Sequence, residues 1–488
     1  MRITLDPAAP DWPAPGAARV GDLAGLRQLV DRHAARLGAA PLAGDRPIIG
    51  TGHQAWLWHP GILAKDLAMV AAAERYGAEA LHLVVDQDAH EAVTLTLPRQ
   101  AGDRLDAVAL RLAHSTHAEV PTGFQPPVDA ERVLDQLRAA GDAPGLAALA
   151  AAFSDGPAAR TLAEQLTAVL LRLMRPYTGP VPVLFTSDLP RLAGYRELVA
   201  AMLRDARRCV QAYNEAVAAV PEAGLTPLAV EPDRVELPLW AAGWQRPRRR
   251  VFADLADSTP IFTDEQGEPL APPPDANADN RNSESTALLP RALLLTAFMR
   301  SRCCDLFIHG TGGGLYDRAT DRWWQTWRHE ALAPAVVVSA DVHLPPFDVP
   351  LATVQDVARA RWRMHHAPYN VDRLLGLDGP LAQEKRRVLA TTLARPAVRR
   401  AGRQPGLREH RQLAFRHLRR INAYLASRHP GPIDDARAEL DRARLGLHNA
   451  TVARRRDWPF AVYPPAALEA LRDEIGRRFA MSGAAPRG

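Results

Sequence analysis

The sequence predicts an α/β protein whose sheet is mostly parallel, with inserted helices and a C-terminal antiparallel helical hairpin. Three stretches, residues 47–98, 181–191 and 288–322, contain a short apolar strand that is followed by polar residues or glycines. Strands that alternate with helices in this way favour a parallel sheet. From about residue 359 a heptad-like spacing replaces the alternation and indicates helices alone.

The first elements lie in the N-terminal part of the chain. Residues 22–37 carry apolar side chains at helical spacing and predict an amphipathic helix. A strand at residues 48–49, a break at 50–52 and a turn at 59–61 then lead into an Ala-rich helix. The second strand of this unit covers residues 81–85.

Polar residues gather where these two strands end. They are Thr51, His53 and Gln54 after the first strand, and Asp86, Asp88 and His90 after the second. Ligands of open α/β sheets bind in the crevice beyond the carboxyl ends of the strands. The sequence therefore predicts a binding site formed by these residues.

The middle of the chain predicts an inserted helical block and a second strand-helix pair. Residues 107–112 alternate weakly as a strand, and residues from about 125 to 175 predict two or three helices. A strand at 181–186 ends in Thr186, Ser187 and Asp188, and a helix that reaches Asn214 follows it. Short strands at 225–230, 235–240 and 250–252 precede a Pro- and Asn-rich loop at 271–285.

A glycine-rich run follows the predicted strand at residues 306–309. It comprises Gly310, Thr311, Gly312, Gly313 and Gly314. Glycines after a strand allow positive φ angles and close backbone approach, so that amides can cradle a phosphate or a carboxylate. The run matches neither the dinucleotide fingerprint nor a P-loop. A flexible turn is the alternative, but the polar residues that follow, including Asp317 and Arg318, favour a site.

The C-terminal part predicts a helical arm. Heptad-like seams at residues 414–425 and 433–447, separated by a breaker at 428–432, predict an antiparallel coiled-coil hairpin. The expected division is a core at 1–358, an arm at 359–456 and a last helix at 457–488 that packs back on the core. Residues 385–456 hold nineteen basic and five acidic residues, so the basic character of the chain is local. A solvated helix face explains this charge better than nucleic-acid binding, because no nucleic-acid motif accompanies it.

Composition bounds the class of protein. The 488 residues contain no apolar run of about 20 residues, and the N-terminus has acidic residues and prolines where a signal peptide would be apolar. We therefore expect a cytoplasmic protein. Cys209, Cys303 and Cys304 have no CxxC spacing, which predicts buried thiols. The histidines show no recognised ligand spacing, so no metal site is expected.

Several short motifs resemble the bacillithiol biosynthesis cysteine-adding enzymes. Residues 51–54, Thr-Gly-His-Gln, match three of the four residues of that family's Thr-Gly-Gln-Gln turn, and residues 88–91 resemble its acidic-His strand exit. The resemblance continues in outline through residues 183–191, 213–215 and 289–291. The sequence departs from the family at His53, at residues 59–61 and at residues 310–322.

The resemblance implies a Rossmann-type core related to class I nucleotidyltransferase-like ligases, plus a coiled-coil arm. It implies an enzyme that joins the carboxyl group of cysteine to the amine of a glucosaminyl malate. Making an amide from a carboxylate requires activation, for which ATP is the expected cofactor. The expected partners are small molecules, an amino acid and a sugar amine, and the arm is a candidate surface for a homodimer.

The residue types then suggest roles. The catalytic candidates are His53, His59, Asp88 and His90, since a histidine can bind phosphate oxygens or act as a general acid. The candidates for binding the nucleotide are Thr51, Gly52, Gln54, Lys65, Gly310, Thr311, Gly312, Gly313 and Arg318. The candidates for binding the substrates are Asp86, Ser187, Asp188, Asn214 and Asp317.

Simpler interpretations stand beside these roles. His59 would merely cap a turn, Lys65 would be exposed on its helix, and residues 86–91 would cap a helix. For the whole chain, the alternatives are another adenylate-forming or nucleotidyltransferase-like enzyme, and a non-catalytic adaptor or nucleic-acid-binding protein.

Overall fold

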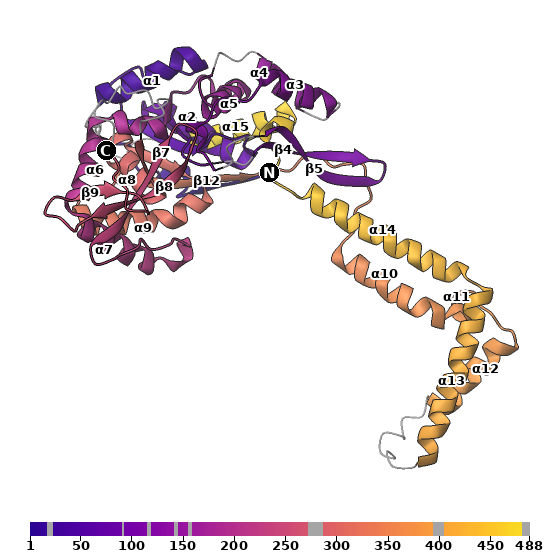
Figure 1. The fold of residues 1–488 in the computed structure, drawn as a ribbon. Coiled ribbons are helices and arrows are strands. Elements are labelled where there is room, and N and C mark those ends of the chain that lie inside the picture. Colours follow the sequence, from indigo (N-terminus) through magenta and orange to yellow (C-terminus); the bar gives the residue numbers. More distant parts are fainter. Residues whose placement is uncertain are drawn as a thin grey trace. The chain divides into compact units, whose positions relative to one another are not determined.

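The computed structural model describes residues 1–16, 23–89, 92–114, 119–140, 145–154, 159–271, 286–393 and 405–480. The fold is mixed α/β and divides into two compact units (Figure 1). The core unit comprises residues 1–97, 108–344 and 456–488, and the helical unit comprises residues 98–107 and 345–455. The helical unit thus begins at residue 345 rather than 359, and it includes a short segment far upstream in the sequence.

A six-stranded, largely parallel sheet forms the centre of the core unit. Its order is β1 (Arg2–Asp6), β12 (Ala335–Asp341), β11 (Leu306–His309), β2 (Ile48–Gln54), β3 (Glu79–Val85) and β6 (Val183–Phe185). All neighbours pair in parallel except β1, which is an antiparallel edge strand on β12. Among the parallel strands, chain order gives the spatial sequence 3-2-1-4-5. The order reverses between β2 and β11, where a ligand crevice is expected.

Strand β2 shows that a glycine-containing segment need not be a turn. The expected break at residues 50–52 does not occur, because the strand continues to Gln54. A side chain at Gly50 would overlap the Cys304 sulfur, and one at Gly52 would lie 2.8 Å from the Leu83 carbonyl oxygen. These glycines therefore permit close packing of the strand on its neighbours.

Helices cover the parallel sheet. Those that contact its strands are α1 (Leu23–Leu37), α2 (Pro60–Tyr76) and α9 (Thr311–Arg328), while α5 (Leu162–Thr178) contacts α1 and α2, α7 (Ala206–Ala219) contacts α9, and α6 (Ala193–Arg204) contacts α7. Helix α2 packs against β2, β3 and β12, and α15 (Pro465–Ala480) packs in turn on α2. The helical block expected at 125–175 contains α3 (Ala130–Ala139), α4 (Leu146–Ser154) and α5.

A second, antiparallel sheet belongs to the core unit. Its order is β10 (Ala287–Pro290), β7 (Arg234–Gly243), β8 (Arg246–Asp254) and β9 (Ile261–Thr263). Strand β10 leads directly into α8 (Ala292–Phe298), a π-helical turn at Met299–Cys303 and strand β11. This connection holds the second sheet close to the parallel sheet. Most of the loop expected at 271–285 lies outside the described residues.

Strands β4 (Ala92–Ala101) and β5 (Arg104–His114) form a two-stranded hairpin. Only the second strand was expected from the sequence. The segment after β3 therefore enters a strand, so the interpretation of residues 86–91 as a helix cap is wrong.

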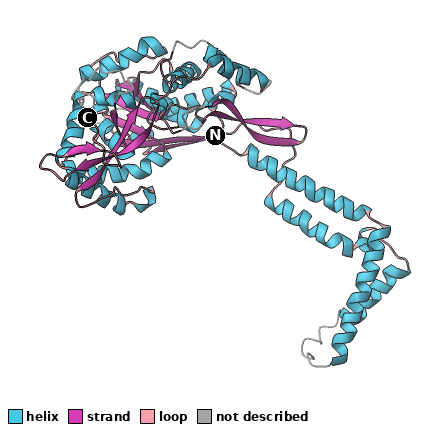
Figure 2. Ribbon diagram, in the orientation of Figure 1, coloured by secondary structure: helices cyan, strands magenta, loops and turns pink. Residues whose placement is uncertain are grey.

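The helical unit differs from the predicted hairpin. Helix α14 (Gly431–Ala453) packs along α10 (Val354–His366), while α13 (Pro405–Arg428) packs on α11 (Val371–Leu374) and α12 (Pro380–Val388) (Figure 2). The described parts of α13 and α14 follow one another and do not pair along their lengths, so the predicted antiparallel pairing is not confirmed. The seam residues Ile421 and Leu425 are buried against Val371 of α11 instead. None of the described helices is long and apolar enough to cross a membrane.

Candidate functional site

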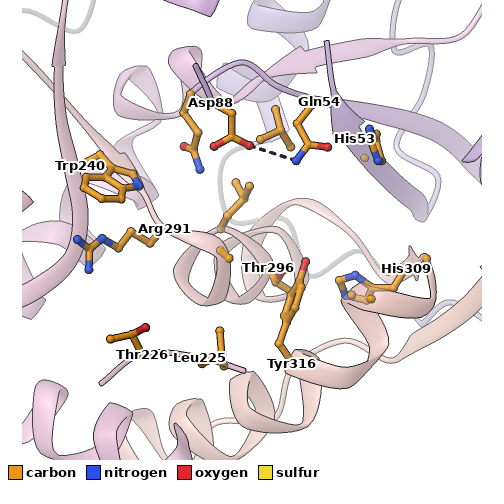
Figure 3. Close-up of a pocket in the computed structure, with 18 of the residues that line it drawn as sticks. His53, Gln54, Asp88, Leu225, Thr226, Trp240, Arg291, Thr296, His309 and Tyr316 are labelled. Atoms are coloured by element: carbon orange, nitrogen blue, oxygen red, sulfur yellow. Dashed lines mark hydrogen bonds between the residues drawn. The ribbon is translucent and has the colours of Figure 1, made fainter. Parts of the chain in front are cut away.

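A cavity of about 960 Å³ opens at the carboxyl ends of β2, β3 and β11, where the strand order of the parallel sheet reverses. The antiparallel sheet, α8 and residues 225–229 form its other side (Figure 3). Its titratable lining residues are His53, His59, Lys65, Asp88, Tyr213, Glu236, Arg248, Arg250, Arg291, His309 and Tyr316. Basic side chains thus outnumber the carboxylates.

Strand β2 and helix α2 supply one wall. Pro60 occupies the first turn of α2, where its missing N–H costs no hydrogen bond, and the Gly61 N–H donates to His59 Nδ1 at 3.1 Å. His59 therefore does cap the helix, as the simpler interpretation held, but its ring also lines the cavity. Because Nδ1 accepts this hydrogen bond, a neutral His59 carries its proton on Nε2.

Lys65 is buried, and the interpretation of it as a solvent-exposed helix residue is wrong. Lys65 follows His59 by more than one helical turn along α2. Its side chain is buried, and Nζ donates a hydrogen bond to the Gly52 carbonyl oxygen at 2.5 Å. Burial lowers its pKa to about 8. The chain has only two lysines among its 60 basic residues, and both are buried. Both lysines therefore place their ammonium groups inside the protein.

The two histidines of this wall favour the neutral form. Burial, together with the nearby charge of Lys65, holds the pKa of His53 well below 6.5. Burial and Arg456 lower the pKa of His59. His53 Nδ1 is buried without a hydrogen-bond partner. Neutral imidazoles beside a cation can donate hydrogen bonds to an anionic ligand without adding positive charge.

The glycine-rich run forms the first turn of α9 rather than a loop. Gly310 is the N-cap, and none of the run's glycines has a positive φ. Gly313 is required by close packing, since a Cβ there would lie 2.5 Å from His309 Nδ1. Gly312 faces open space. The first amides of a helix have no partner within it, so the N–H groups of Thr311, Gly312 and Gly313 offer an anion-binding end of α9.

The antiparallel sheet brings a second cationic wall that the sequence did not reveal. Two guanidinium groups lie over the Trp240 ring, with Arg291 Cζ 4.0 Å and Arg248 Cζ 4.5 Å from its centroid. Arg248 also bonds Asp88 Oδ1 at 2.9 Å, and Asp88 accepts from Gln54 at 3.1 Å. Figure 3 shows Trp240 and Arg291 on one side of the cavity, with His53 and His309 on the other.

The structure gathers many of the predicted residues at this cavity. Those that line it are Gly52, His53, Gln54, His59, Lys65, Asp88, Gly310, Thr311, Gly312 and Gly313. Those that lie elsewhere are Thr51, Asp86, Ser187, Asp188, Asn214, Asp317 and Arg318. His90 lies outside the described residues.

Asp86, Ser187 and Thr51 connect neighbouring strands. Asp86 accepts hydrogen bonds from the hydroxyls of Thr186 and Ser187 at 2.5 and 2.6 Å, and from the Ser187 amide at 2.9 Å. Burial raises the pKa of Asp86 to about 6 despite these bonds. The Thr51 hydroxyl donates to the Ile308 carbonyl oxygen at 2.8 Å. These residues hold β3 to the turn after β6, and β2 to β11.

The other predicted residues that do not line the cavity also have structural partners. Asp188 contacts His33 of α1 at 2.6 Å, and Asn214 bonds both backbone groups of Leu228. Arg318 is exposed and pairs with Glu222 at 2.6 Å. Each side chain is engaged away from the cavity, so the expected binding roles of these residues have no geometric support.

Asp317 lies behind the cavity wall. It contacts Arg300 at 2.9 Å and the cavity residue His309 at 3.3 Å. Although burial acts to raise its pKa, these two basic neighbours hold the pKa of Asp317 below its usual value. Asp317 therefore supports His309 from beneath the cavity surface.

The cavity is also lined by polar and aromatic residues that were not predicted from the sequence. They are Glu236, Trp240, Arg248, Arg250, Arg291, His309 and Tyr316. Arg248 and Arg250, two residues apart on one face of β8, were the available signal. Within the described ranges, no group of three or more His, Cys, Asp or Glu residues is arranged to hold a metal ion. All three cysteines are buried, as predicted.

No protein-family model matches this chain, and no curated protein matches its sequence.

Proposed function

We propose that this chain is a carbon–nitrogen ligase that joins the carboxyl group of cysteine to the amine of glucosaminyl malate. The observation that carries the proposal is the meeting of buried Lys65, two neutral histidines and the N-terminus of α9 at one cavity. An acid is activated and joined to an amine through anionic intermediates, and these groups are suited to bind them. The motifs at residues 51–54 and 88–91 supply the substrate identity by resemblance.

We infer that the parallel sheet is of the Rossmann type. The spatial order 3-2-1-4-5 and the reversal between β2 and β11 support this assignment. The cavity opens at that reversal, which is where such sheets bind nucleotides.

We propose ATP as the activating cosubstrate, which would convert the unreactive carboxylate into an acyl donor. The amides of residues 311–313 and the ammonium group of Lys65 would contact its phosphates. His53 and His59, both neutral, would donate hydrogen bonds to oxygens that gain charge during the reaction. The engagement of Asp88 by Arg248 and Gln54 supports a positioning role for this carboxylate rather than that of a general base.

We place the reaction in the cytoplasm. Burial raises the thiol pKa of Cys209 and Cys304, which lie buried as free thiols. Free cysteines are typical of a reducing compartment, which would also keep the cysteine substrate as a thiol.

Deletion of the gene in its native organism, followed by thiol profiling, tests the proposal. We expect loss of one low-molecular-weight thiol and accumulation of its cysteine-free precursor. Complementation with the wild-type gene should restore the thiol, whereas Lys65→Met should not. An unchanged thiol pool in the deletion strain would refute the proposed substrates.

A further inference from the structure

The wall opposite Lys65 carries guanidinium groups that nucleotide binding at α9 does not use. The Cζ atoms of Arg291 and Arg248 lie over the Trp240 ring, at 4.0 and 4.5 Å from its centroid. Cation–π contacts of this kind fix the position of a guanidinium group and leave its edge N–H donors free. Trp240 thus orients two arginines at the cavity surface.

The charges of this wall do not balance. Glu236 contacts Arg291 at 2.8 Å and Arg250 at 3.7 Å, so one buried carboxylate forms ion pairs with two guanidinium groups. Asp88 forms an ion pair with Arg248. Three arginines therefore face two carboxylates, and Arg250 has only the longer contact.

Unused donors accompany the excess charge. The Nε of Arg291 is buried without a hydrogen-bond partner. The side chain of Arg250 is 47% exposed, while that of Glu236 is 6% exposed. The wall can therefore accept one further anionic group without losing the contacts that hold it together.

We propose that Arg248, Arg250 and Arg291 form a subsite for a carboxylate group of the amine substrate. Planar guanidinium groups bind carboxylates, like phosphates, through paired N–H donors, and the helix N-terminus and Lys65 already provide a separate site for the phosphates. The subsite rests on the proposed function, because it assigns the acid-bearing amine to this wall and ATP to the other. The dicarboxylate of a sugar malate has the chemistry that this wall selects.

Calorimetric titration with (S)-malate and, separately, with ATP tests the subsite without turnover. We expect wild-type protein to bind malate, and Arg250→Gln to weaken this binding by about tenfold or more. The binding of ATP should change by less than about twofold, the spread expected for a residue that makes no contact. Arg246→Gln is the matched control, because Arg246 is exposed on the same strand but does not line the cavity.

A second variant tests whether malate binding depends on the whole arginine wall and not on Arg250 alone. Trp240→Leu keeps every charge but removes the ring that orients Arg248 and Arg291, so it should also weaken malate binding. Circular dichroism and thermal melting show whether each variant is folded. If Trp240→Leu does not fold, the comparison of Arg250→Gln with Arg246→Gln decides.

Three results would overturn the subsite. The first is that the wild type binds no malate up to about 10 mM, a concentration at which even weak specific binding is measurable. The second is that Arg250→Gln and Arg246→Gln bind malate with equal affinity. The third is that Arg250→Gln loses ATP binding but retains malate binding. Failure of the ligase reaction is a separate outcome. If malate binding depends on Arg250 but the protein forms no amide, the result would support the subsite and contradict the proposed reaction.

Discussion

Lys65 combines burial, a shifted pKa and a place in the cavity. Its ammonium group is held against the Gly52 carbonyl oxygen, and burial lowers its pKa to about 8. The residue is therefore charged below about pH 8 and becomes neutral above it. A cation that titrates so near neutrality makes the binding of an anion depend on pH.

Affinity for ATP should consequently fall as the pH rises through about 8. Below that value the protonated amine attracts the phosphates, and above it the attraction is lost. Calorimetry between pH 6.5 and 9.5 measures the effect, and Lys65→Met should bind weakly with no step near pH 8. A wild-type affinity that is flat over this range would show that Lys65 does not contact the ligand.

Asp86 carries a prediction about stability rather than binding. Its folded pKa of about 6 lies above the ordinary 3.8, so its contribution to stability is present below about pH 4 and is lost as the pH rises to about 6. Asp86→Ala should lower the free energy of unfolding by about 2 kcal/mol or more, because it leaves buried donors unpaired. Asp86→Asn can still accept from Thr186 and Ser187 and should cost much less.

Urea denaturation of the two Asp86 variants at several pH values measures both effects. In Asp86→Asn the decline in stability between about pH 4 and 6 should be reduced. Wild-type stability in Asp86→Ala would mean that the bonds to Thr186 and Ser187 contribute little.

The first turn of α9 joins packing and binding in one element. Gly313 packs on His309, whereas Gly312 faces open space. Gly313→Ala should lower the melting temperature and weaken ATP binding, because the added Cβ displaces the His309 ring or the helix end. Gly312→Ala should be neutral or gain about 0.5–1 kcal/mol, since alanine favours a helix.

Thermal melting of these two alanine variants is a matched comparison, since they lie on consecutive positions of one helix. Equal melting temperatures would contradict the close packing of α9 on β11. Retained ATP affinity in a destabilised Gly313→Ala would separate the packing role from the binding role.

At this scale, local pattern predicted which segments form elements, but not which segments meet. The apolar runs that end at Val85 and His309 were strands with polar exits, as expected. The seams of α13 and α14 correctly marked buried faces, but periodicity does not name the partner, and α10 and α11 cover those faces. Gly50 and Gly52 marked close packing within a strand rather than a turn.

The same limit explains the errors at the site. Strand β3 ends at Val85, so the alternation of side chains along a strand does not predict where Asp86 and Asp88 point. Asp88 reaches the cavity, whereas Asp86 is buried between β3 and the turn after β6. The arginine wall was missed because it comes from a second sheet that is placed by the β10–α8–β11 connection, a tertiary arrangement with no local signature.

Across the whole molecule, exposed large apolar side chains are concentrated in the helical unit. Trp362, Phe415 and Tyr424 are each more than half exposed. Exposed apolar residues that gather on one surface can mark an interface, and we propose that this unit mediates formation of a homodimer. Tyr424→Glu should then shift the sedimentation coefficient from dimer to monomer.

Ile261→Glu is the control for this test, because Ile261 is an exposed apolar residue of the core unit. It should leave the association state unchanged. A wild-type chain that sediments as a monomer at every concentration would reject the homodimer.

Formation of the amide by the purified protein tests the proposed ligase most directly. We expect that cysteine, glucosaminyl malate and ATP yield a product with the mass of the two substrates less one water, detected by mass spectrometry. Lys65→Met should abolish the product while remaining folded, and the exposed-surface variant Arg246→Gln should retain wild-type activity. Absence of product from the wild type, or equal rates in Lys65→Met and the wild type, would contradict the proposed ligase.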